Sequence, residues 1–581
     1  MGNFITDNID IWTSAIVSKK SVGRGSSKKQ EAYGIKKLRE LILELAVRGK
    51  LVPQDESDES ASVLLKKIVI EREQLIADKQ IKKLKKFKDI EDHEYPFSLP
   101  TNWKFVRLND IGDWGAGATP TRGNPKYYGG KIPWFKSGEL NADYISEASE
   151  YITELALKES SVRYNKVGDV LLAMYGATIG KTSILKIRAT TNQAVCACTP
   201  FNGFENIFLL MLLKAYKHRF TNMGVGGAQP NISREKIIAT IIPLPPLNEQ
   251  KRIVKKVDEL MLLCDKLEVE QDKNSETHQI LVETLLDTLT KVKTNDEFSK
   301  TWQNIAEYFD VLFTTEKSIK KLEETILQLA VMGKLVAQDE HDEPASELLE
   351  RIVEEKERLI AEGKIKKQKN LSEIAEIEVP FPLPENWEFV RLGNYCNIFS
   401  GNSFKSTDFN KENGTKVIKI TNAGVGELIE TNDYLPKHFI DNYKSYIVQK
   451  DDLILALTRP YISTGLKISK CPDSYHNSLL NQRVATIRLI INTDYIYIFL
   501  KSRYVLNLYK DRFGGSGLQP NLKVSDVTEL VIPIPPLNEQ KRIVKKVDEL
   551  MALCDSLRLN LREMQTTEVN LADSVAEMLV E

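Results

Sequence analysis

The longest helical pattern in the chain starts after Pro245-Pro246 and recurs close to the carboxyl end. Its apolar positions alternate between steps of four and three residues, which is the spacing of a coiled-coil seam. Asn248 is a good N-cap, and neither Pro nor Gly interrupts the run before about Val292, so we expect one helix there. A helix of about 43 residues would be roughly 65 Å long at 1.5 Å per residue. The seam residues are Ile253, Val257, Leu260, Cys264 and Leu267 and, in the second copy, Ile543, Val547, Leu550, Cys554 and Leu557.

We expect the two seams to pack on each other and to act as a spacer as much as a core. An ordinary core helix of a bundle is the alternative, because so short a heptad run is not unique to coiled coils.

Upstream, an apolar stripe over residues 38–45 ends at Gly49, and Ser62 opens a helix that we extend to about Lys88. The end of that helix is basic, so it either meets phosphates or is a solvated face. Its lysines are Lys79, Lys82, Lys83, Lys85, Lys86 and Lys88.

The stretches between these helices have the sequence pattern of α/β domains. Short apolar runs over residues 169–174 and 452–457 predict strands, and Gly and Pro turns separate such runs. An apolar helix is expected over residues 207–220 in the first stretch and over 495–513 in the second. Both helices lead into a glycine-rich loop that ends in Gln-Pro-Asn. The two stretches are therefore expected to be diverged copies of one fold.

Almost the whole chain is an internal repeat in which a helical frame and an insert alternate. Residues 36–85 align without a gap on 320–369 with 33 identities in 50 positions, and 241–264 align on 531–554 with 21 in 24. The fold class predicted is α+β, with two globular α/β domains joined by long antiparallel coiled-coil helices in a pseudo-two-fold repeat. The boundaries predicted are 1–100 for an N-terminal helical region, 101–245 for the first insert, 246–384 for a central helical region, 385–535 for the second insert and 536–581 for a C-terminal helix.

Composition and charge exclude several classes of protein. With 581 residues, 42% hydrophobic and 28% charged, the chain is neither wholly disordered nor a fibre, and its apolar runs are too short to span a membrane. The polar first 30 residues carry no secretory signal, and six cysteines without paired spacing are typical of reduced thiols. The net charge is −1, but residues 101–245 carry +6 and residues 385–535 carry +3, which favours inserts that touch a polyanion.

No motif predicts catalysis by this chain. The six histidines are scattered, and no cysteine or histidine pair has metal-ligand spacing. The segment from Gly176 to Thr182 is similar to a phosphate loop, but it has three residues between its glycines where that motif needs four. Neither a methyltransferase signature nor an acidic nuclease centre is found. We therefore expect no chemistry from the chain alone, and an activity of its own is the disfavoured hypothesis.

Several repeated segments together resemble a known family. They are Pro-Leu-Pro-Pro-Leu-Asn-Glu-Gln-Lys-Arg-Ile-Val at 243–254 with its twin at 533–544, the Gln-Pro-Asn loops, the Leu-Pro-x-Asn-Trp starts of the inserts, and Leu-Ala-Val-x-Gly-Lys-Leu-Val. As a doubled set over residues 36–581, they resemble the specificity subunit of type I restriction-modification systems. Residues 1–35 match no motif of that family.

This resemblance implies a DNA-binding subunit that is not itself catalytic. In the family, two target recognition domains each read one half of a bipartite DNA site, and helices hold the two domains apart. Two different inserts imply an asymmetric site. The helices also dock two methyltransferase (modification) subunits, and restriction (motor and nuclease) subunits join them. The resemblance thus places S-adenosylmethionine, ATP and magnesium on partner subunits, no cofactor or metal on this chain, and the complex in a prokaryotic cytoplasm.

Polar and basic side chains in or near the glycine-rich loops are the candidate DNA contacts, because they can bond base edges or phosphates. In the first insert they are Thr119, Thr121, Arg122, Lys136, Ser137, Tyr175, Asn192, Gln193, Gln229 and Asn231; in the second they are Asn402, Lys405, Asn422, Arg459, Asn481, Gln482, Arg483, Gln519 and Asn521. The shared Gln-Pro-Asn residues cannot distinguish two half-sites, so they either shape the loop or touch the DNA backbone.

The rival hypothesis is a protein-interaction scaffold whose divergent inserts hold two protein ligands. Binding that weakens steeply with salt would favour DNA.

Overall fold

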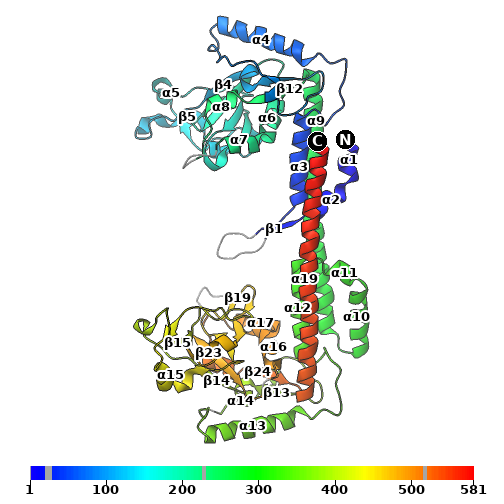
Figure 1. The fold of residues 1–581 in the computed structure, drawn as a ribbon, viewed down its shortest axis with the longest axis vertical. Helices are drawn as coiled ribbons and strands as arrows, with labels where there is room; N and C mark the ends of the chain where they lie inside the picture. The colour runs from blue at the N-terminus through cyan, green and yellow to red at the C-terminus, as the bar shows by residue number, and fades with distance from the viewer. Residues whose placement is uncertain (1, 20–28, 225–229, 369, 492, 514–519) are drawn as a thin grey trace. The chain divides into compact units, whose positions relative to one another are not determined.

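The computed structural model contains two compact units, each with a sheet-rich domain and a helical frame (Figure 1). It describes residues 2–19, 29–224, 230–368, 370–491, 493–513 and 520–581. The first unit is Met1–Asn274 with Met564–Glu581, and the second is Ser275–Glu563. The two sheet-rich domains and helices of 45 and 44 residues confirm the predicted α+β class.

The elements of the first unit alternate between frame helices and the strands of one domain. Its helices are α1 (Gly2–Asp7), α2 (Ile9–Ser14), α3 (Tyr33–Val47), α4 (Ala61–Ala77), α5 (Glu154–Glu159), α6 (Asn206–Ala215), α7 (Lys217–Met223), α8 (Arg234–Ile238) and the first part of α9 (Leu247–Lys291). Its strands are β1 (Val17–Lys19), β2 (Lys29–Glu31), β3 (Lys104–Arg107), β4 (Gly112–Ala116), β5 (Tyr128–Phe135), β6 (Tyr144–Ile145), β7 (Tyr151–Ile152), β8 (Val170–Ala173), β9 (Thr182–Leu185), β10 (Thr190–Thr191), β11 (Val195–Pro200) and β12 (Ile241–Leu244).

The second unit repeats that order. Its helices are the end of α9, α10 (Asn295–Glu307), α11 (Phe309–Leu312), α12 (Glu316–Val331), α13 (Ala345–Ala361), α14 (Leu392–Tyr395), α15 (Phe439–Asn442), α16 (Tyr495–Lys501), α17 (Arg503–Arg512), α18 (Val524–Thr528) and the first part of α19 (Leu537–Val580). Its strands are β13 (Glu388–Arg391), β14 (Cys396–Ser400), β15 (Thr415–Ile418), β16 (Tyr434–Leu435), β17 (Ile447–Val448), β18 (Leu453–Ala456), β19 (Tyr461–Ile462), β20 (Gly465–Leu466), β21 (Ile468–Lys470), β22 (Ser478–Leu480), β23 (Val484–Leu489) and β24 (Val531–Ile534).

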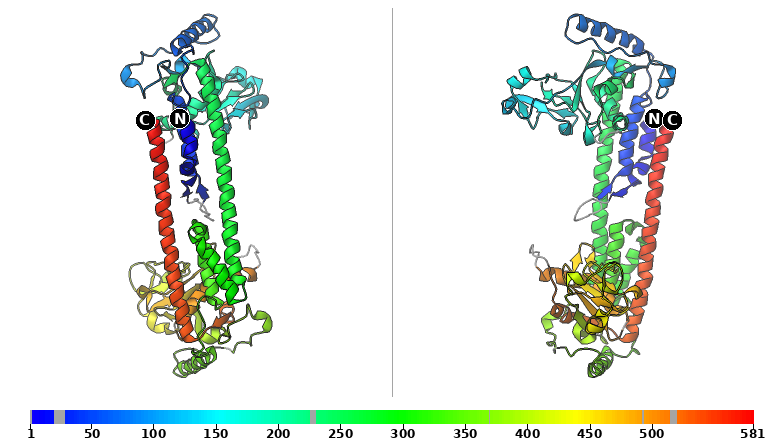
Figure 2. Two further views of the ribbon diagram at one scale, coloured as in Figure 1. Left: turned by 90° about the vertical axis from the view of Figure 1, so that its right-hand side faces the viewer. Right: turned by 60° about the vertical axis from the view of Figure 1, so that its left-hand side comes forward.

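In the first unit, α3 lies between the start of α9 and the last turns of α19 (Figure 2). Arg39 of α3 forms an ion pair with Asp265 of α9 at 2.7 Å, and Lys37 pairs with Asp573 of α19 at 2.9 Å. Beyond the end of α3, the Lys50 ammonium donates to the carbonyl of Val580 at 2.8 Å. The apolar stripe of α3 and the first seam lie in one buried cluster, so this short helix packs with that seam.

In the second unit, α12 takes the corresponding place between the end of α9 and the start of α19. Lys321 pairs with Asp287 of α9, and Arg558 of α19 binds Glu323. Lys334, the counterpart of Lys50, donates to the Thr290 carbonyl at 2.9 Å. The second seam is buried or half-buried in the cluster that contains α12.

The expectation that the two seams pack on each other is therefore wrong. They lie in separate buried clusters, one in each unit. Each seam instead packs on a short helix with an apolar stripe and on the far end of the other long helix, such as Ala572 and Val575 in the first unit. The reason is local: α3 and α12 are amphipathic, and each must bury its own stripe.

The repeated Asn-Glu-Gln-Lys-Arg segment fixes the start of each long helix. Glu249 accepts hydrogen bonds from the Trp103 indole at 2.9 Å and from Gln54 at 2.6 Å. Gln250 donates to the carbonyl of Pro245 at 3.1 Å, which ties the helix to the strand before it. Burial raises the pKa of Glu249 above its ordinary value, while the two hydrogen bonds act against that rise. This motif of the sequence is thus a structural joint of the frame.

Three predicted helices differ from the structure at their ends. The helix opened by Ser62 ends at Ala77 and does not reach Lys88. Lys79 adopts a positive φ of 57°, and the amide of Gln80 bonds back to the Leu75 carbonyl, which closes the last turn. The two apolar helices of the inserts are each divided in two, at Tyr216 and at Ser502. A side-chain N-cap explains the second division, because the Ser502 hydroxyl accepts from a backbone amide of the next helix.

The described part of the N-terminal stretch that matches no motif, residues 2–19 and 29–35, contributes to the frame. Ile5, Trp12 and Ala15 are buried in the same cluster as α3. Gln271 of α9 donates to the Thr13 carbonyl at 2.6 Å. In the second unit, α10 and α11 precede α12 in the same way, and His278 of α9 contacts the Val311 carbonyl at 3.1 Å. The N-terminal segment is therefore the counterpart of α10 and α11.

Candidate nucleic-acid interface

The two sheet-rich domains share one topology, so their edges can be compared position by position. The strand order β4-β11-β8-β9 of the first domain matches β14-β23-β18-β21 of the second. The parallel pair of β5 with β10 matches the parallel pair of β15 with β22. These matches confirm the expectation that the inserts are diverged copies of one fold.

Most candidate residues lie on one edge of each domain, which we call the recognition edge. It consists of residues 117–122, 174–176, 192–194 and 230–232 in the first domain, and of 401–405, 457–459, 481–483 and 520–522 in the second. Backbone hydrogen bonds join the segments: Met174 donates to Ala194 at 2.8 Å and accepts from Ile232 at 2.9 Å. The corresponding bonds of the second domain are 2.9 and 2.7 Å long. Both edges thus have one backbone framework.

In the first domain a cluster of charges and rings lies beside the recognition edge. Glu150 accepts from Arg122 and pairs with the Lys136 ammonium at 2.8 Å. The Arg122 guanidinium also lies over the rings of Tyr128 and Trp134, at 4.8 and 4.9 Å from their centroids. The bond from Arg122 holds the pKa of the Glu150 carboxyl below its ordinary value. Arg122 is therefore held as a planar donor at the surface, where it can bind a base edge or a phosphate.

The other candidates of the first domain are mostly exposed side chains of this edge. Thr119 and Gln193 are hydrogen-bonded to each other, although the loops that carry them are far apart in sequence. Tyr175 and Asn231 form a backbone bridge. The carbonyl of Asn192 accepts from Val195 in a tight turn, and Thr121, also exposed, lies in the turn before Asn124. Ser137, half-buried beside Lys136, begins a short 3-10 helix.

In the second domain several corresponding positions hold different side chains, although the Asn-Gln pair at 192–193 and 481–482 is shared. Asn402 and Asn481 form a parallel bridge, and Thr458 and Asn521 form an antiparallel one. The exposed candidates of the second domain are Lys405, Arg459, Gln482, Arg483 and Asn521. The structure thus brings Asn402, Asn481, Gln482, Arg483, Arg459 and Asn521 together on one edge, as it does their counterparts in the first domain.

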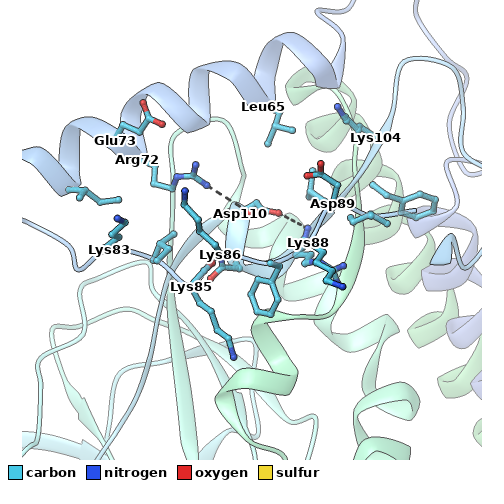
Figure 3. A pocket seen from close by; sticks show the side chains of 18 of the residues that line it. Leu65, Arg72, Glu73, Lys83, Lys85, Lys86, Lys88, Asp89, Lys104 and Asp110 are labelled. Carbon is cyan, nitrogen blue, oxygen red and sulfur yellow. Dashed lines mark hydrogen bonds and ion pairs between the residues drawn. The ribbon is translucent and has the colours of Figure 1, made fainter. Parts of the chain in front are cut away.

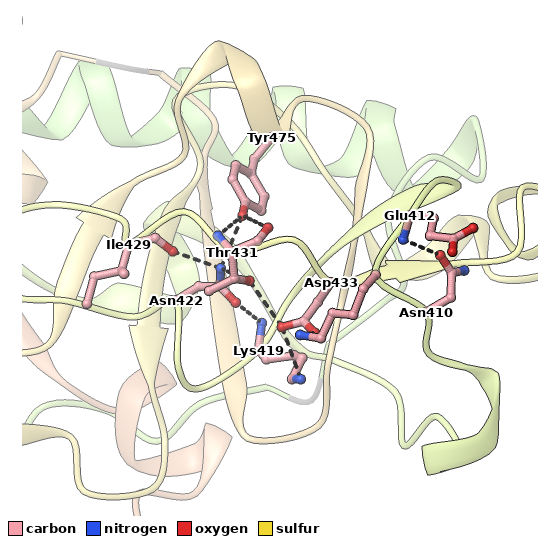
Figure 4. A network of polar contacts seen from close by, with 9 residues as sticks. Asn410, Glu412, Lys419, Asn422, Ile429, Thr431, Asp433 and Tyr475 are labelled. Carbon is pink, nitrogen blue, oxygen red and sulfur yellow. Dashed lines mark hydrogen bonds and ion pairs between the residues drawn. The ribbon is translucent and has the colours of Figure 1, made fainter.

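Asn422 differs from the other candidates because its side chain is fully buried. Its amide nitrogen donates to the Ile429 carbonyl at 2.8 Å and to Thr431 at 3.1 Å, and its oxygen accepts from the Lys419 amide at 2.8 Å (Figure 4). The Tyr475 hydroxyl lies 3.2 Å from the same nitrogen. The sequence suggested a DNA contact here, but the amide is engaged within the domain, and Asn422 holds a loop in place.

Gln229 and Gln519 lie outside the described residues, so their DNA contact stays a prediction. Their neighbours Pro230 and Pro520 accept hydrogen bonds from Gly176 and Arg459, each at 2.8 Å. The Pro-Asn part of the segment is thus joined to the turn after β8 or β18 in both domains. This shared backbone role agrees with the expectation that the segment does not distinguish the half-sites.

The basic stretch after α4 forms a cleft of about 790 Å³ against β3 (Figure 3). We call it the lysine cleft, and its lysines are Lys83, Lys85, Lys86, Lys88 and Lys104. The half-buried Ile81, Leu84 and Phe87 recur every third residue along an extended segment and pack inward, so the lysines between them face solvent. At the cleft floor Arg72 pairs with Asp110, but among the described residues no carboxylate forms an ion pair with the five lysines. Solvent-facing lysines of this kind favour the binding of a polyanion.

Sequence reasoning missed Glu150 and the alignment of the two recognition edges. The shared Asn-Gln pair, Asn192-Gln193 and Asn481-Gln482, was the signal that could have aligned them. It precedes β11 in one domain and β23 in the other, with the same backbone bonds. No such signal identified Glu150, because only the folded chain brings it to Arg122.

The described ranges, with their gaps, contain no group of three His, Cys, Asp or Glu side chains placed to hold a metal ion. Within the same ranges, no helix combines the length and the apolar character that crossing a bilayer requires.

Comparisons with known proteins find a doubled domain and relatives that match over nearly their whole length. The family model described as type I restriction modification DNA specificity domain matches residues 100–276 and again 384–563. The chain is 37% identical to the EcoAI specificity subunit and 35% identical to the EcoEI specificity subunit of type I restriction enzymes from Escherichia coli, over 99% of this chain and 99% and 98% of those proteins. A crystal structure of the HsdS subunit from Thermoanaerobacter tengcongensis aligns with 84% of this chain and 98% of its own, at 16% identity and a TM-score of 0.41. Because the domain model matches twice and the relatives match over nearly their whole length, the chain belongs to the specificity subunits of type I restriction enzymes, and its role is DNA sequence specificity.

Proposed function

We propose that each recognition edge reads one half of an asymmetric, bipartite DNA target. The observation that carries this proposal is one backbone framework that occurs twice, with different side chains at several equivalent positions. Base edges in the major groove are distinguished by paired donors and acceptors, which arginine, asparagine and glutamine side chains supply. Two different sets of such side chains require two different half-sequences.

The lysine cleft contributes to affinity and not to sequence choice. Lysine contacts to phosphates carry no base information, but each neutralised phosphate releases counterions. The five lysines adjoin the strand that leads into the first domain, so they are placed to contact the DNA backbone beside its half-site.

The helical frames hold the domains apart and dock two methyltransferase subunits. The frames repeat the same contacts in both units, so each methyltransferase copy meets the same surface. Restriction subunits join this core, and S-adenosylmethionine, ATP and magnesium bind to those partners. This chain is non-catalytic and acts in the cytoplasm of a prokaryotic cell.

Mapping of N6-methyladenine across the genome, with and without this gene, tests the proposal. Loss of methylation at one bipartite, asymmetric motif is expected. Salt titration of the purified chain with its methyltransferase partner separates DNA binding from the protein-scaffold alternative, because DNA binding weakens steeply as salt rises. Binding that ignores salt, together with an unchanged methylation map, would contradict the proposal.

The spacing role has its own test. Inserting whole turns after Leu267 of α9, and the same number of turns in α19, is expected to change the gap between the half-sites and to leave both half-sequences unchanged. Each turn adds roughly 5.4 Å along a helix. The readout is the methylated motif of the lengthened variant, with a variant carrying neutral substitutions at the same two points as its control. An unchanged gap would remove the spacer role.

A further inference from the structure

The connection that continues from the recognition edge is longer in the second domain than in the first. It leads from β8 to β9 in one domain and from β18 to β21 in the other, and both strand pairs are antiparallel. Equivalent backbone bonds mark its two ends: Ala173 donates to the Lys181 carbonyl, and Ala456 donates to the Lys467 carbonyl. Seven residues lie between these ends in the first domain and ten in the second. The second domain therefore carries three additional residues at this place.

The longer connection forms the hairpin β19–β20 at the margin of the second domain (Figure 1). In the first domain the same connection, whose residues are all described, forms a short 3-10 helix, Gly176–Thr178. Leu466 of β20 is buried in the core of its unit, as Ile179 is in the first domain. Ile462 of β19 and the turn residues 463–464 are exposed. The hairpin thus presents an apolar side chain beside the recognition edge.

A hollow of about 380 Å³ opens next to this hairpin. The apolar side chains that line it include Val425, Ile429 and Ile462, and its cations are Arg459 and Lys467. Ile429 and Ile462 are 54% and 45% exposed, so a ligand can reach both side chains. An apolar surface and two positive charges therefore lie together at the recognition edge of the second domain.

The loop that forms the other wall of the hollow, residues 420–429, is held in place by polar contacts. The buried Asn422 amide donates to the Ile429 carbonyl at 2.8 Å, and the Ile429 amide donates to the Asn422 carbonyl at 2.9 Å (Figure 4). The Gly426 amide donates to the Ile468 carbonyl at 2.9 Å, which joins the loop to β21. A wall that is fixed before binding loses little conformational entropy when a ligand enters.

We propose that this hollow takes the C5-methyl group of a thymine and that Ile462 is a specificity-determining residue for it, an inference that rests on the function proposed above. A two-stranded β-ribbon fits into the major groove, where the methyl group of thymine is the apolar feature by which an A·T pair is recognised. Arg459 and Lys467 supply the positive charge that attracts the phosphates around such a base pair. Because the first domain forms a 3-10 helix at this place, thymine is read in this way in one half-site alone.

Replacement of thymine by deoxyuridine tests the inference, because deoxyuridine keeps every pairing group and lacks the methyl group. The duplexes carry the motif that the methylation map supplies. The half-site of the second domain is the one that persists when residues 101–245 are exchanged. For the native chain assembled with its methyltransferase partner, one replacement in that half-site is expected to weaken binding roughly 4-fold, the effect of about one buried methyl group.

The variant Ile462→Ala is expected to bind the thymine and the deoxyuridine duplexes alike. Its Tm should stay unchanged, because the side chain is exposed. Val167→Ala is the matched control, since Val167 is an exposed apolar residue before β8, at the end of that strand away from the recognition edge. This control should keep the native preference for thymine. Effects of deoxyuridine in the half-site of the first domain should be the same in all three proteins.

Several results would overturn the inference. They are a half-site of the second domain without an A·T pair, native binding that no single deoxyuridine in that half-site weakens, an equal loss for both kinds of duplex in Ile462→Ala, and a Tm that falls together with binding in that variant. Failure of the proposed function has a different outcome: the native complex then yields no bipartite motif, and both proposals fall together. A bipartite motif that is insensitive to deoxyuridine refutes the role of the hollow alone.

Discussion

The helical frames and the recognition edges of the two units differ in what they repeat. The frames repeat side-chain contacts: the indole of Trp103 lies 2.9 Å from Glu249, and that of Trp387 lies 3.0 Å from Glu539. The edges repeat backbone bonds and a few side chains, such as Gln193 and Gln482, while their other exposed side chains differ. A surface that serves the same partner twice must keep its side chains, whereas a surface that reads two sequences must change them. Comparison of the two copies within the chain therefore shows which residues are structural.

The largest effect is expected from exchanging one domain, with its recognition edge, as a whole. Replacing residues 101–245 with the matching segment of a relative should change one half of the methylated motif completely and leave the other half intact. The reason is that the second domain, which is not replaced, keeps its residues and its bonds to its own frame. Genome-wide methylation mapping of the hybrid measures this. A hybrid in which both halves change would show that the edges are not independent.

A smaller effect, equal in both units, is expected from breaking the frame joint. Trp103→Phe and Trp387→Phe each remove an indole donor from a buried carboxylate, at a cost of about 1–3 kcal/mol of unfolding free energy. The matched contacts predict that the two costs differ by less than about 0.5 kcal/mol, a difference within ordinary error for equivalent sites. Denaturant unfolding of each variant gives the values. Clearly unequal costs would mean that the frames are not equivalent.

The lysine cleft offers a comparison with the second copy of the frame. Lys86→Asn, Lys88→Ser and Lys104→Glu copy Asn370, Ser372 and Glu388, the residues at the corresponding positions. DNA affinity should fall for all sequences alike, and the slope of log affinity against log salt should shrink by about 0.9 for each lost phosphate contact. Binding titrations at several salt concentrations test this.

The control variant makes the opposite exchange in the second copy of the frame, Asn370→Lys with Ser372→Lys. A change of methylated motif in the cleft variants would contradict a role limited to phosphates. An unchanged salt slope would remove the DNA contact from the cleft.

The smallest effect concerns the buried carboxylates of the joints. Burial raises the pKa of both Glu249 and Glu539 above the ordinary value of 4.5. At pH values just above 4.5 the folded chain therefore binds more protons than the unfolded chain. Stability is therefore expected to fall slightly as the pH rises through this window, because the unfolded chain binds fewer protons there. Glu249→Gln should remove the fall in the first unit, and Glu539→Gln in the second. Unfolding free energies of the native chain and of the glutamine variants at pH 4.5 to 7 test the sign, and a dependence on pH that is the same in the variants as in the native chain would contradict it.

Much of the fold followed from local patterns of the sequence. The heptad spacing and the absence of Pro and Gly predicted the long helix, which runs from Leu247 to Lys291. The repeat predicted two copies of one domain, and the Gln-Pro-Asn segments pointed to one edge of each. These features are local in the chain or recur in it, so they can be recognised without coordinates.

Other features depended on contacts between distant residues. The seams pack on α3 and α12 and not on each other, because those helices bury stripes of their own. Asn422 is similar to the other candidates in sequence, yet its amide is buried by Thr431 and Tyr475.

The sequence alone determined the doubled architecture, the long helices and the family. Periodicity and repetition are properties of the chain and survive without tertiary structure. Only the tertiary structure decided that Arg459 stands where the first domain has Gly176, that Glu150 reaches Arg122, and that Asn422 is buried. Equivalence, pairing and burial are relations between segments far apart in sequence, which packing and backbone hydrogen bonds bring together.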